Sequence, residues 1–129
     1  MKFVKAGRII IPDGAYPEDH EIETARVLIK SGKDIEFLVP VRTNGAQTPD
    51  VTWNNIDWEL KSPRGKGKRL LDNTIRRAQK QSPNIIVDLR RVKLKDRQVI
   101  DKLSNNPNIL RGVKRLKAIT KGDEVVDIK

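Results

Sequence analysis

The continuous apolar run Ile85-Ile86-Val87 constrains the fold of this chain more than any other feature. Successive side chains of a β-strand point to opposite faces of its sheet, so a strand that is apolar at consecutive positions must be covered on both faces. The chain has 129 residues, the usual length of one domain with one core of ordinary size. We therefore expect residues 84–89 to be an interior strand of a single sheet that helices flank.

Hydrophobic spacing and helix stop signals predict three helices. Residues 18–31 open with acidic side chains and end before Gly32, a pattern typical of helix start and stop. Residues 69–81 place apolar side chains at helical spacing and end before Pro83. A third helix is expected at residues 95–104.

The remaining apolar segments predict strands, with a tight turn at Asn54 and Asn55 because asparagine tolerates positive φ. Residues 42–47 are expected to be a flexible loop and residues 62–68 a mobile basic loop. The predicted class is α/β, with a single mixed central sheet flanked by helices. The predicted strands are residues 35–39, 50–52, 56–61, 84–89, 113–119 and 125–128, with a short strand or extended arm around residues 9–11.

Charged residues are unevenly distributed along the chain. Residues 1–60 hold seven basic and ten acidic side chains, a balance of −3, whereas residues 61–129 hold 20 and 7, a balance of +13. A basic half favours a polyanion such as nucleic acid as a partner, because neutralised phosphates release counterions; solvated surface or a membrane face would give the same composition. The chain has no cysteine, which excludes disulfides and thiolate zinc sites.

Neither a membrane segment nor an export signal is expected. No apolar stretch approaches the ~20 residues that are needed to span a bilayer. The apolar run near the N-terminus is too short for a signal peptide. We therefore expect a soluble chain.

Residues 57–61, Asp-Trp-Glu-Leu-Lys, alternate charged and apolar side chains. In a strand, this alternation sends Trp58 and Leu60 into the core and leaves the charged residues on the other face. An edge strand with a charged solvent face is one explanation. Asp50 favours another, because cross-strand neighbours in a hairpin lie ~5 Å apart, and Asp50 and Glu59 at that spacing can share a divalent cation.

The sequence Pro49-Asp50, followed by Glu59-Leu60-Lys61, resembles the PD-(D/E)XK nuclease motif. The predicted order of elements resembles the αβββαβ core of that superfamily, which is restriction-endonuclease-like. The flanking sequence resembles the tRNase domain at the C-terminus of CdiA toxins, which act in contact-dependent growth inhibition. The segments that carry this resemblance are Thr48-Pro49-Asp50, Trp-Glu-Leu-Lys-Ser-Pro-Arg-Gly at residues 58–65, and Gln-Ser-Pro-Asn-Ile-Ile-Val-Asp-Leu at residues 81–89.

The resemblance covers about residues 20–89. It implies that residues 1–17 form an N-terminal extension and residues 18–129 a PD-(D/E)XK nuclease domain. The implied activity is a metal-dependent endoribonuclease of toxin type that cleaves tRNA.

The expected active centre consists of Asp50, Glu59 and Lys61. The two carboxylates, with the carbonyl of Leu60 as a further oxygen ligand, are expected to bind a divalent metal: Mg²⁺ first, with Mn²⁺ or Zn²⁺ as alternatives. Lys61 would orient or help to deprotonate the attacking water and offset charge on the phosphorane; a surface lysine is the alternative. The same groups would equally serve an RNA 2′-hydroxyl as nucleophile.

Three further residues are candidates for the site. Glu21 shares a helix face with residues that pack on the sheet, so it is the better catalytic candidate of the first helix, although a first-turn acid also stabilises the helix dipole. His20 is the single histidine of the chain, which excludes a paired-histidine ribonuclease mechanism. We interpret it as a helix-start residue. Gln81 is a candidate active-site amide by resemblance, or else a helix-terminal polar residue.

Basic residues follow the expected centre and are predicted to position phosphates. Aromatic residues make up 4% of the chain, so shape and backbone recognition of a folded RNA is favoured over base stacking. The predicted nucleic-acid-binding residues are Arg64, Lys66, Lys68, Arg69, Arg76, Arg77 and Lys80, and a second basic cluster comprises Arg90, Arg91, Lys93, Lys95 and Arg97.

Two other functions fit the same residues. One is a DNA endonuclease of a phage or mobile element, because most of the PD-(D/E)XK superfamily acts on DNA. The other is a non-catalytic nucleic-acid-binding or phage structural module. For the toxin, the expected partners are tRNA and a cognate immunity protein, which is commonly acidic when the toxin is basic. The expected site of action is the cytoplasm of a bacterial cell, with delivery as part of a larger secreted toxin.

Overall fold

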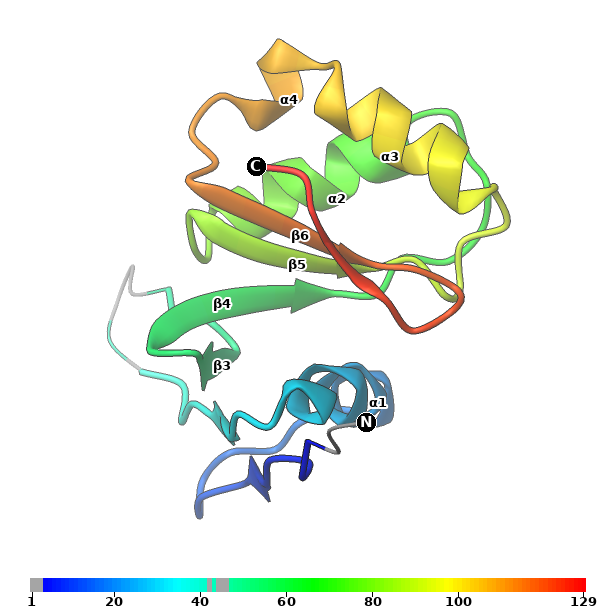
Figure 1. The fold of residues 1–129 in the computed structure, drawn as a ribbon. Helices are drawn as coiled ribbons and strands as arrows, with labels where there is room; N and C mark the ends of the chain where they lie inside the picture. The colour runs from blue at the N-terminus through cyan, green and yellow to red at the C-terminus, as the bar shows by residue number, and fades with distance from the viewer. Residues whose placement is uncertain (1–3, 42, 44–46) are drawn as a thin grey trace.

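The computed structural model describes residues 4–41, 43 and 47–129, and within them the chain forms one mixed sheet of seven strands. The strands lie in the order β1 to β7, so each strand is paired with its neighbours in sequence (Figure 1). The pairs β1–β2, β4–β5 and β5–β6 are parallel and the others antiparallel. The strands are β1 (Ile9–Ile10), β2 (Ile35–Phe37), β3 (Val51–Trp53), β4 (Ile56–Lys61), β5 (Asn84–Asp88), β6 (Arg115–Ile119) and β7 (Val125–Asp127).

Helices cover both faces of this sheet, as predicted. The helix α1 (Asp19–Leu28), continued by the 3₁₀ helix η1 (Ile29–Ser31), lies on one face, and α2 (Leu70–Gln79), α3 (Asp96–Ser104) and α4 (Pro107–Leu110) lie on the other (Figure 1). Two apolar cores result, one on each side of the strands. Their division explains the run at residues 85–87: Ile85 and Val87 belong to the core under α2 and α3, whereas Ile86 belongs to the core under α1.

The predicted hairpin is confirmed. Strands β3 and β4 pair antiparallel, with Val51 opposite Trp58, and the turn between them places Asn54 at φ 55° and Asn55 at φ 61°. Asparagine accepts this left-handed backbone at low cost, which explains why two of them occur there. The hairpin joins the sheet on both sides, so β4 is the middle strand and not an edge strand. The edge-strand explanation of its alternating charges is therefore wrong.

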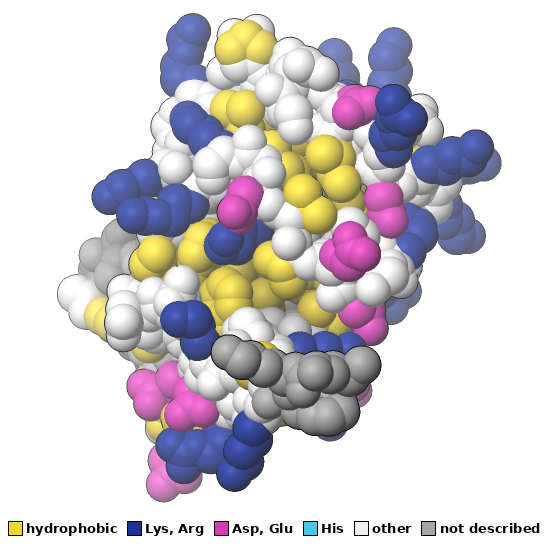
Figure 2. Space-filling view, viewed as in Figure 1, with side chains coloured by type: hydrophobic (Ala, Val, Ile, Leu, Met, Phe, Trp, Pro, Cys, Tyr) yellow, Lys and Arg dark blue, Asp and Glu magenta, His cyan; other side chains and the backbone are white. Residues whose placement is uncertain are grey.

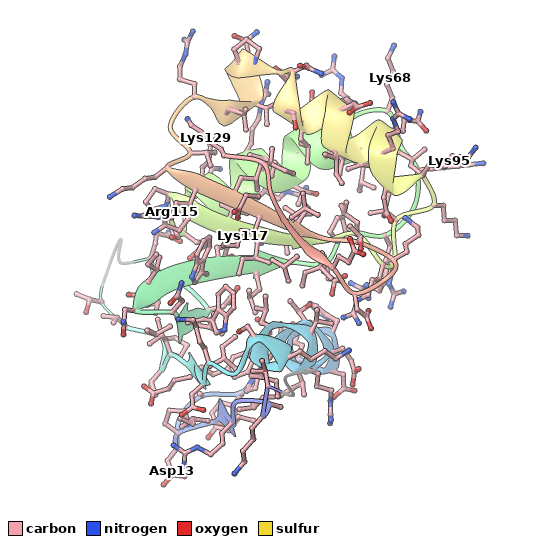
Figure 3. The ribbon with its side chains drawn as sticks, in the orientation of Figure 1. Asp13, Lys68, Lys95, Arg115, Lys117 and Lys129 are labelled. Atoms are coloured by element: carbon pink, nitrogen blue, oxygen red, sulfur yellow. The ribbon has the colours of Figure 1, made fainter. Side chains whose placement is uncertain are left out.

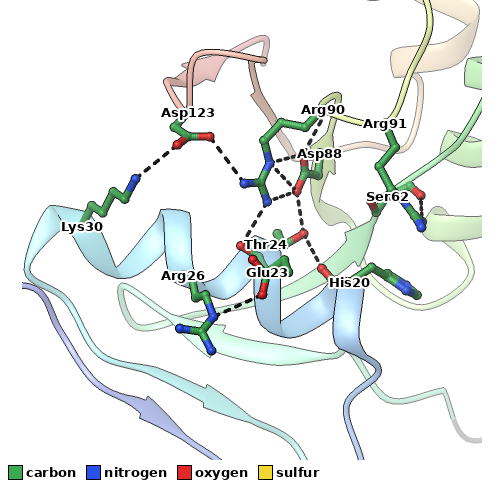
Figure 4. Close-up of polar contacts among 10 residues, drawn as sticks. All are labelled: His20, Glu23, Thr24, Arg26, Lys30, Ser62, Asp88, Arg90, Arg91 and Asp123. Atoms are coloured by element: carbon green, nitrogen blue, oxygen red, sulfur yellow. Dashed lines mark hydrogen bonds and ion pairs between the residues drawn. The ribbon is translucent and has the colours of Figure 1, made fainter.

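A buried polar network fixes α1 to the end of β5. The Thr24 hydroxyl donates to Oδ2 of Asp88 at 2.8 Å, and Asp88 is only 2% exposed. The Arg90 guanidinium also donates to both Asp88 oxygens and contacts Asp123, whose carboxylate pairs with Lys30 (Figure 4). Burial would raise the pKa of Asp88, but the hydrogen bonds from Arg90 and Thr24 together hold it below its usual value.

The structure adds local detail to the sequence predictions. The short helix α4 was not predicted because four residues are too few for a periodic signal; Asn106 caps it by accepting from the Ile109 N–H. The expected mobile loop at residues 62–68 is fastened by a β-bridge between Gly65 and Val92. Most of the expected loop at residues 42–47 lies outside the described residues. No helix of the described chain combines the length and hydrophobicity needed to cross a membrane.

The two cores predict a contrast between two isoleucines. Ile75 of α2 is fully buried, whereas Ile11 is 48% exposed. Replacing Ile75 by Ala should lower the free energy of unfolding by about 2–4 kcal/mol, because a cavity remains in a close-packed core. Replacing Ile11 by Ala should change it by less than ~0.5 kcal/mol. Urea unfolding of both variants tests this, and equal losses would contradict the packing described.

Candidate active site

The carboxylates of Asp50 and Glu59 come together across the β3–β4 hairpin. Asp50 directly precedes Val51, which pairs with Trp58, and the Asp50 and Glu59 side chains interact with each other. The Asp50 backbone N–H donates to the Trp58 carbonyl at 3.0 Å, and the Leu60 N–H donates to Oδ2 of Asp50 at 2.8 Å. The Asp50 carboxylate therefore accepts a hydrogen bond that a backbone carbonyl of the neighbouring strand would otherwise accept. This hydrogen bond fixes the direction of the Asp50 side chain.

Glu59 and Lys61 lie on the same face of β4. Their partners in β5 are Ile85 and Val87, which belong to the core under α2. Glu59 is only 5% exposed, and its Oε2 lies 3.4 Å from the Lys61 ammonium nitrogen. Its other oxygen, Oε1, is buried without a hydrogen-bond partner within the described part of the chain. A buried acceptor left in this state is costly unless another group satisfies it.

Glu21 approaches the same place from the start of α1. Ala25 and Leu28 on its helix face are buried in the core, as the helical spacing predicts, and Glu21 is half-buried. One oxygen of its carboxylate accepts from the Glu18 N–H at 2.9 Å and thus caps the helix. Its pKa also responds to Asp50. The capping interpretation and the site interpretation therefore apply to the same side chain.

These side chains border one open cavity of about 480 Å³. It lies between the first turn of α1, the end of β4, the segment that follows β4, and one face of α2. Six charged residues of the predicted site line it. The lining residues are Glu18, His20, Glu21, Asp50, Glu59, Leu60, Lys61, Ser62, Pro63, Arg64, Leu70, Thr74 and Arg77.

Three of the four carboxyl groups that line the cavity resist ionisation. Burial, and next the charge of Glu59, raises the pKa of Asp50 from 3.8 to about 7. Burial also raises the pKa of Glu59, although its interactions with Asp50 and Lys61 oppose that rise. Burial, with a smaller effect of Asp50, raises the pKa of Glu21. Burial is the largest cause of all three rises, and neighbouring carboxylates add to it.

The donor set fits a hard divalent cation. The Asp50 and Glu59 carboxyl groups interact, and Oε1 of Glu59 has no hydrogen-bond partner in the described chain. Among residues 4–41, 43 and 47–129, no three His, Asp or Glu side chains are already gathered as a complete metal cage. A pair of carboxylates is nevertheless the usual protein contribution to Mg²⁺, which keeps several waters and binds substrate phosphates. Ca²⁺, which needs six to eight oxygen ligands, fits less well.

The predicted nucleic-acid-binding residues separate into two groups. Arg64 and Arg77 line the cavity. Figure 3 shows Lys68, one of the others, pointing away from the sheet, and Figure 2 shows basic side chains over the helical half of the molecule. The members that are exposed and do not line the cavity are Lys66, Lys68, Arg69, Arg76 and Lys80.

Gln81 does not line the cavity, although it continues a stripe that does. Leu70, Thr74 and Arg77 are spaced by four and three residues, so they share the face of α2 that borders the cavity. Gln81 is four residues beyond Arg77, after the end of the helix. Thr74 was missed from the sequence; its helical spacing to Arg77 was the available signal.

The second basic cluster is not uniform. Arg90 forms ion pairs with Asp88 and Asp123, so its charge is neutralised within the fold. Arg91 instead donates its Nε–H to the Ser62 hydroxyl at 2.9 Å and another N–H to the Ser62 carbonyl. Ser62 follows Lys61 directly and had not been predicted as a site residue.

The raised pKa of Asp50 predicts how stability depends on pH. Because the folded pKa of about 7 exceeds the value of 3.8 expected when unfolded, folding takes up a proton between these values, and stability falls as pH rises through about 7. Asp50→Asn keeps an oxygen acceptor for the Leu60 N–H and removes the charge. In metal-free buffer at pH 8 we expect this variant to be more stable than the natural chain by on the order of 2 kcal/mol, after allowance for solvent screening.

Urea unfolding in EDTA at pH 4 to 8 measures this effect. The difference between the two proteins should become small toward pH 4, where Asp50 is protonated in the folded chain and close to its pKa of 3.8 in the unfolded chain. The matched control is Glu36→Gln, which removes an exposed carboxylate from β2. Parallel pH profiles for the Asp50 variant and the natural chain would contradict the assignment of a buried, proton-binding carboxyl.

Comparisons with known proteins agree on one family. No curated protein matches the chain. Its fold is similar to a chain of a solved structure, the CdiA-CT/CdiI toxin and immunity complex from Burkholderia pseudomallei, with a TM-score of 0.69 and 18% sequence identity over 95% of this chain and 99% of that chain. At that identity the likeness establishes the fold alone. The family model of the contact-dependent growth inhibition CdiA C-terminal domain matches residues 47–125, more than half of the sequence. The chain therefore belongs to the CdiA C-terminal domain family, whose members are toxin domains of contact-dependent growth inhibition.

Proposed function

We propose that this chain is a metal-dependent endoribonuclease of the PD-(D/E)XK type that cleaves tRNA. The observation that carries the proposal is the pair of half-buried Asp50 and buried Glu59, with Lys61 3.4 Å from Glu59, inside a cavity that two arginines border. Clustered carboxyl groups with raised pKa in a cleft are typical of functional sites, because such a cluster costs stability.

The order of elements supports the PD-(D/E)XK core. From α1 to β5 the chain runs helix, three strands, helix and strand, the αβββαβ order of that superfamily. The carboxylates of the motif stand immediately before β3 and within β4, and their side chains interact. The nuclease unit is proposed to be residues 18–129, with residues 1–17 as an extension.

The roles of the residues follow from their contacts. Asp50 and Glu59 would hold the metal, which supplies Lewis acidity toward the scissile phosphate when it is bound. Lys61 would hold and orient the attacking oxygen and balance the charge that develops on the phosphate. Glu59 keeps Lys61 directed at the cavity through their ion pair. Glu21 would accept a hydrogen bond from water there with the oxygen that the helix cap leaves available.

The preference for RNA is supported by the resemblance of residues 48–50, 58–65 and 81–89 to the tRNase domain of CdiA toxins. A cognate immunity protein is proposed as a partner, because the similar solved structure is described as a toxin and immunity complex. With a net charge of +10 on the chain, an acidic partner surface would be complementary. Delivery by a larger secreted protein and action in the cytoplasm of a target cell follow from membership in the family.

Cleavage assays with site variants test the proposed function. The purified chain should cut a tRNA pool in the presence of Mg²⁺ or Mn²⁺ and lose this activity in EDTA. Asp50→Asn, Glu59→Gln and Lys61→Met should each lower the rate by about 10²–10⁴-fold, because each removes a metal ligand or a charge from the reacting centre. Analysis of the product ends distinguishes water from the 2′-hydroxyl as nucleophile.

Asp57→Asn is the matched control for these variants. Asp57 lies on the same strand and at the same two-residue spacing from Glu59 as Lys61, but it is exposed and outside the cavity. Its activity should stay within about twofold of the natural chain. A duplex DNA and a single-stranded DNA of matched length test the DNA endonuclease alternative. Failure to cut either polymer with any divalent metal would contradict the proposal and favour a non-catalytic binding module.

Two neighbouring arginines of α2 provide a second test. Arg77 lines the cavity and Arg76 does not, yet both are exposed and carry the same charge. Arg77→Gln should lower the cleavage rate at subsaturating tRNA by about tenfold or more, because it removes a phosphate contact next to the reacting centre. Arg76→Gln should lower it less than threefold. Equal effects of the two variants would show that general charge, and not the cavity, governs the substrate.

A further inference from the structure

A second cavity of about 250 Å³ lies beside the carboxylate centre. It is lined by His20, Glu23, Ser62, Asp88, Arg90 and Arg91. His20 and Ser62 also line the first cavity, so the two hollows are contiguous at these residues. Figure 4 shows His20, Ser62 and Arg91 next to one another, beside the network of Asp88 and Arg90. A nucleic-acid strand that passes Lys61 would reach this second cavity next.

The two arginines of the second cavity differ in their charge balance. Arg90 forms ion pairs with Asp88 and Asp123, so its charge is already used within the fold. Arg91 contacts only the neutral hydroxyl and carbonyl of Ser62, and no described carboxylate lies within ion-pair distance of it. A guanidinium has five N–H donors, so most of those of Arg91 remain available.

Arg91 is also held in a definite position. Its carbonyl accepts from the Gly65 N–H, and the Lys93 N–H donates to the Gly65 carbonyl at 2.7 Å. These bonds and the Gly65–Val92 bridge tie the backbone around Arg91 to the segment that follows β4. The side chain is half-buried against Ser62. A preorganised cation of this kind loses little side-chain entropy when an anion binds, and arginine suits phosphate oxygens in particular.

We propose that Arg91, held by Ser62, binds a second phosphate of the nucleic-acid strand, adjacent to the scissile phosphate at the carboxylate centre. The identity of the ligand rests on the proposed nuclease function. Ser62 couples the two positions, because it follows Lys61 in the chain and anchors Arg91 through its hydroxyl and carbonyl oxygens. The strand would therefore be held on both sides of Ser62, which sets its direction across the site.

The test is a double-mutant cycle between Arg91 and single phosphates. The probes are RNA octamers in which one linkage at a time is a neutral methylphosphonate, bound to protein that carries Asp50→Asn to prevent cleavage. With Arg91 present, neutralising the contacted phosphate should weaken binding about tenfold. With Arg91→Gln, which keeps a donor for Ser62, the same substitution should have almost no effect, and the slope of log K against log salt should fall by about 0.7 for the unmodified octamer.

Lys93→Gln is the matched control. Lys93 lies two residues from Arg91 and lines neither cavity, so this variant removes one positive charge outside the proposed phosphate site. It should leave the sensitivity to each linkage unchanged. The thermal midpoint of each variant reports whether it is folded. Retained sensitivity at every linkage in Arg91→Gln, or the same loss in Lys93→Gln, would overturn the proposal.

The outcomes separate this inference from the proposed function. If octamer binding depends on Arg91 but the natural chain does not cleave, the proposed nuclease function is overturned and the phosphate subsite stands. If cleavage depends on Asp50 but octamer binding does not depend on Arg91, the nuclease function stands and the phosphate subsite is overturned. Absence of both binding and cleavage would overturn both.

Discussion

The hydrogen bond from the Leu60 N–H to the Asp50 carboxylate is the contact on which the site depends. It replaces a backbone acceptor at the point where the chain enters β3, and so it holds a half-buried carboxylate beside that of Glu59. Burial and the second charge raise the pKa of Asp50 to about 7, so the arrangement costs stability when both groups are ionised. A fold maintains such a cost where a cation or a reaction requires it.

The rest of the fold keeps these charges in place. Strand β4 is paired on both sides, so Glu59 cannot move away from Asp50 without disrupting the sheet. On the α1 side, the buried Asp88 accepts from Thr24 and Arg90, which fixes the helix that carries Glu21. The cationic groups occupy the opposite wall, on α2 and on the segment after β4. The cavity thus has cations on one wall and the Asp50 and Glu59 carboxylates at the base.

The fold places the basic residues of the chain in different environments. The basic excess of residues 61–129 is spread over the helical half of the molecule (Figure 2), and much of it is remote from the cavity. Within the same stretch, Arg90 serves the fold, Arg77 lines the cavity, and Arg76 is directed elsewhere. Under the proposed function, net charge would attract the polyanion, whereas the few cations that line the two cavities would determine where it is held.

Sequence alone determined the elements whose signals are local. The helices follow from apolar spacing and stop residues, the Asn54-Asn55 turn from its tolerance of positive φ, and the two-sided burial of β5 from three consecutive apolar residues. The candidate residues Asp50, Glu59, Lys61 and Glu21 were likewise available, because alternation and helical spacing place them on definite faces. These signals act within a few residues, so they are readable without the fold.

Only the tertiary structure decided which of these groups meet. The interior position of β4 depends on its pairing with both β3 and β5, and the difference between Arg90 and Arg91 depends on partners as distant as Asp123 and Ser62. Ion pairing, burial and register are set by residues far apart in sequence, and no local pattern encodes them. For that reason the sequence predicted a carboxylate pair and a basic surface, whereas the cavity that combines them, and the second one beside it, emerged from the packing of α1 and α2 around the sheet.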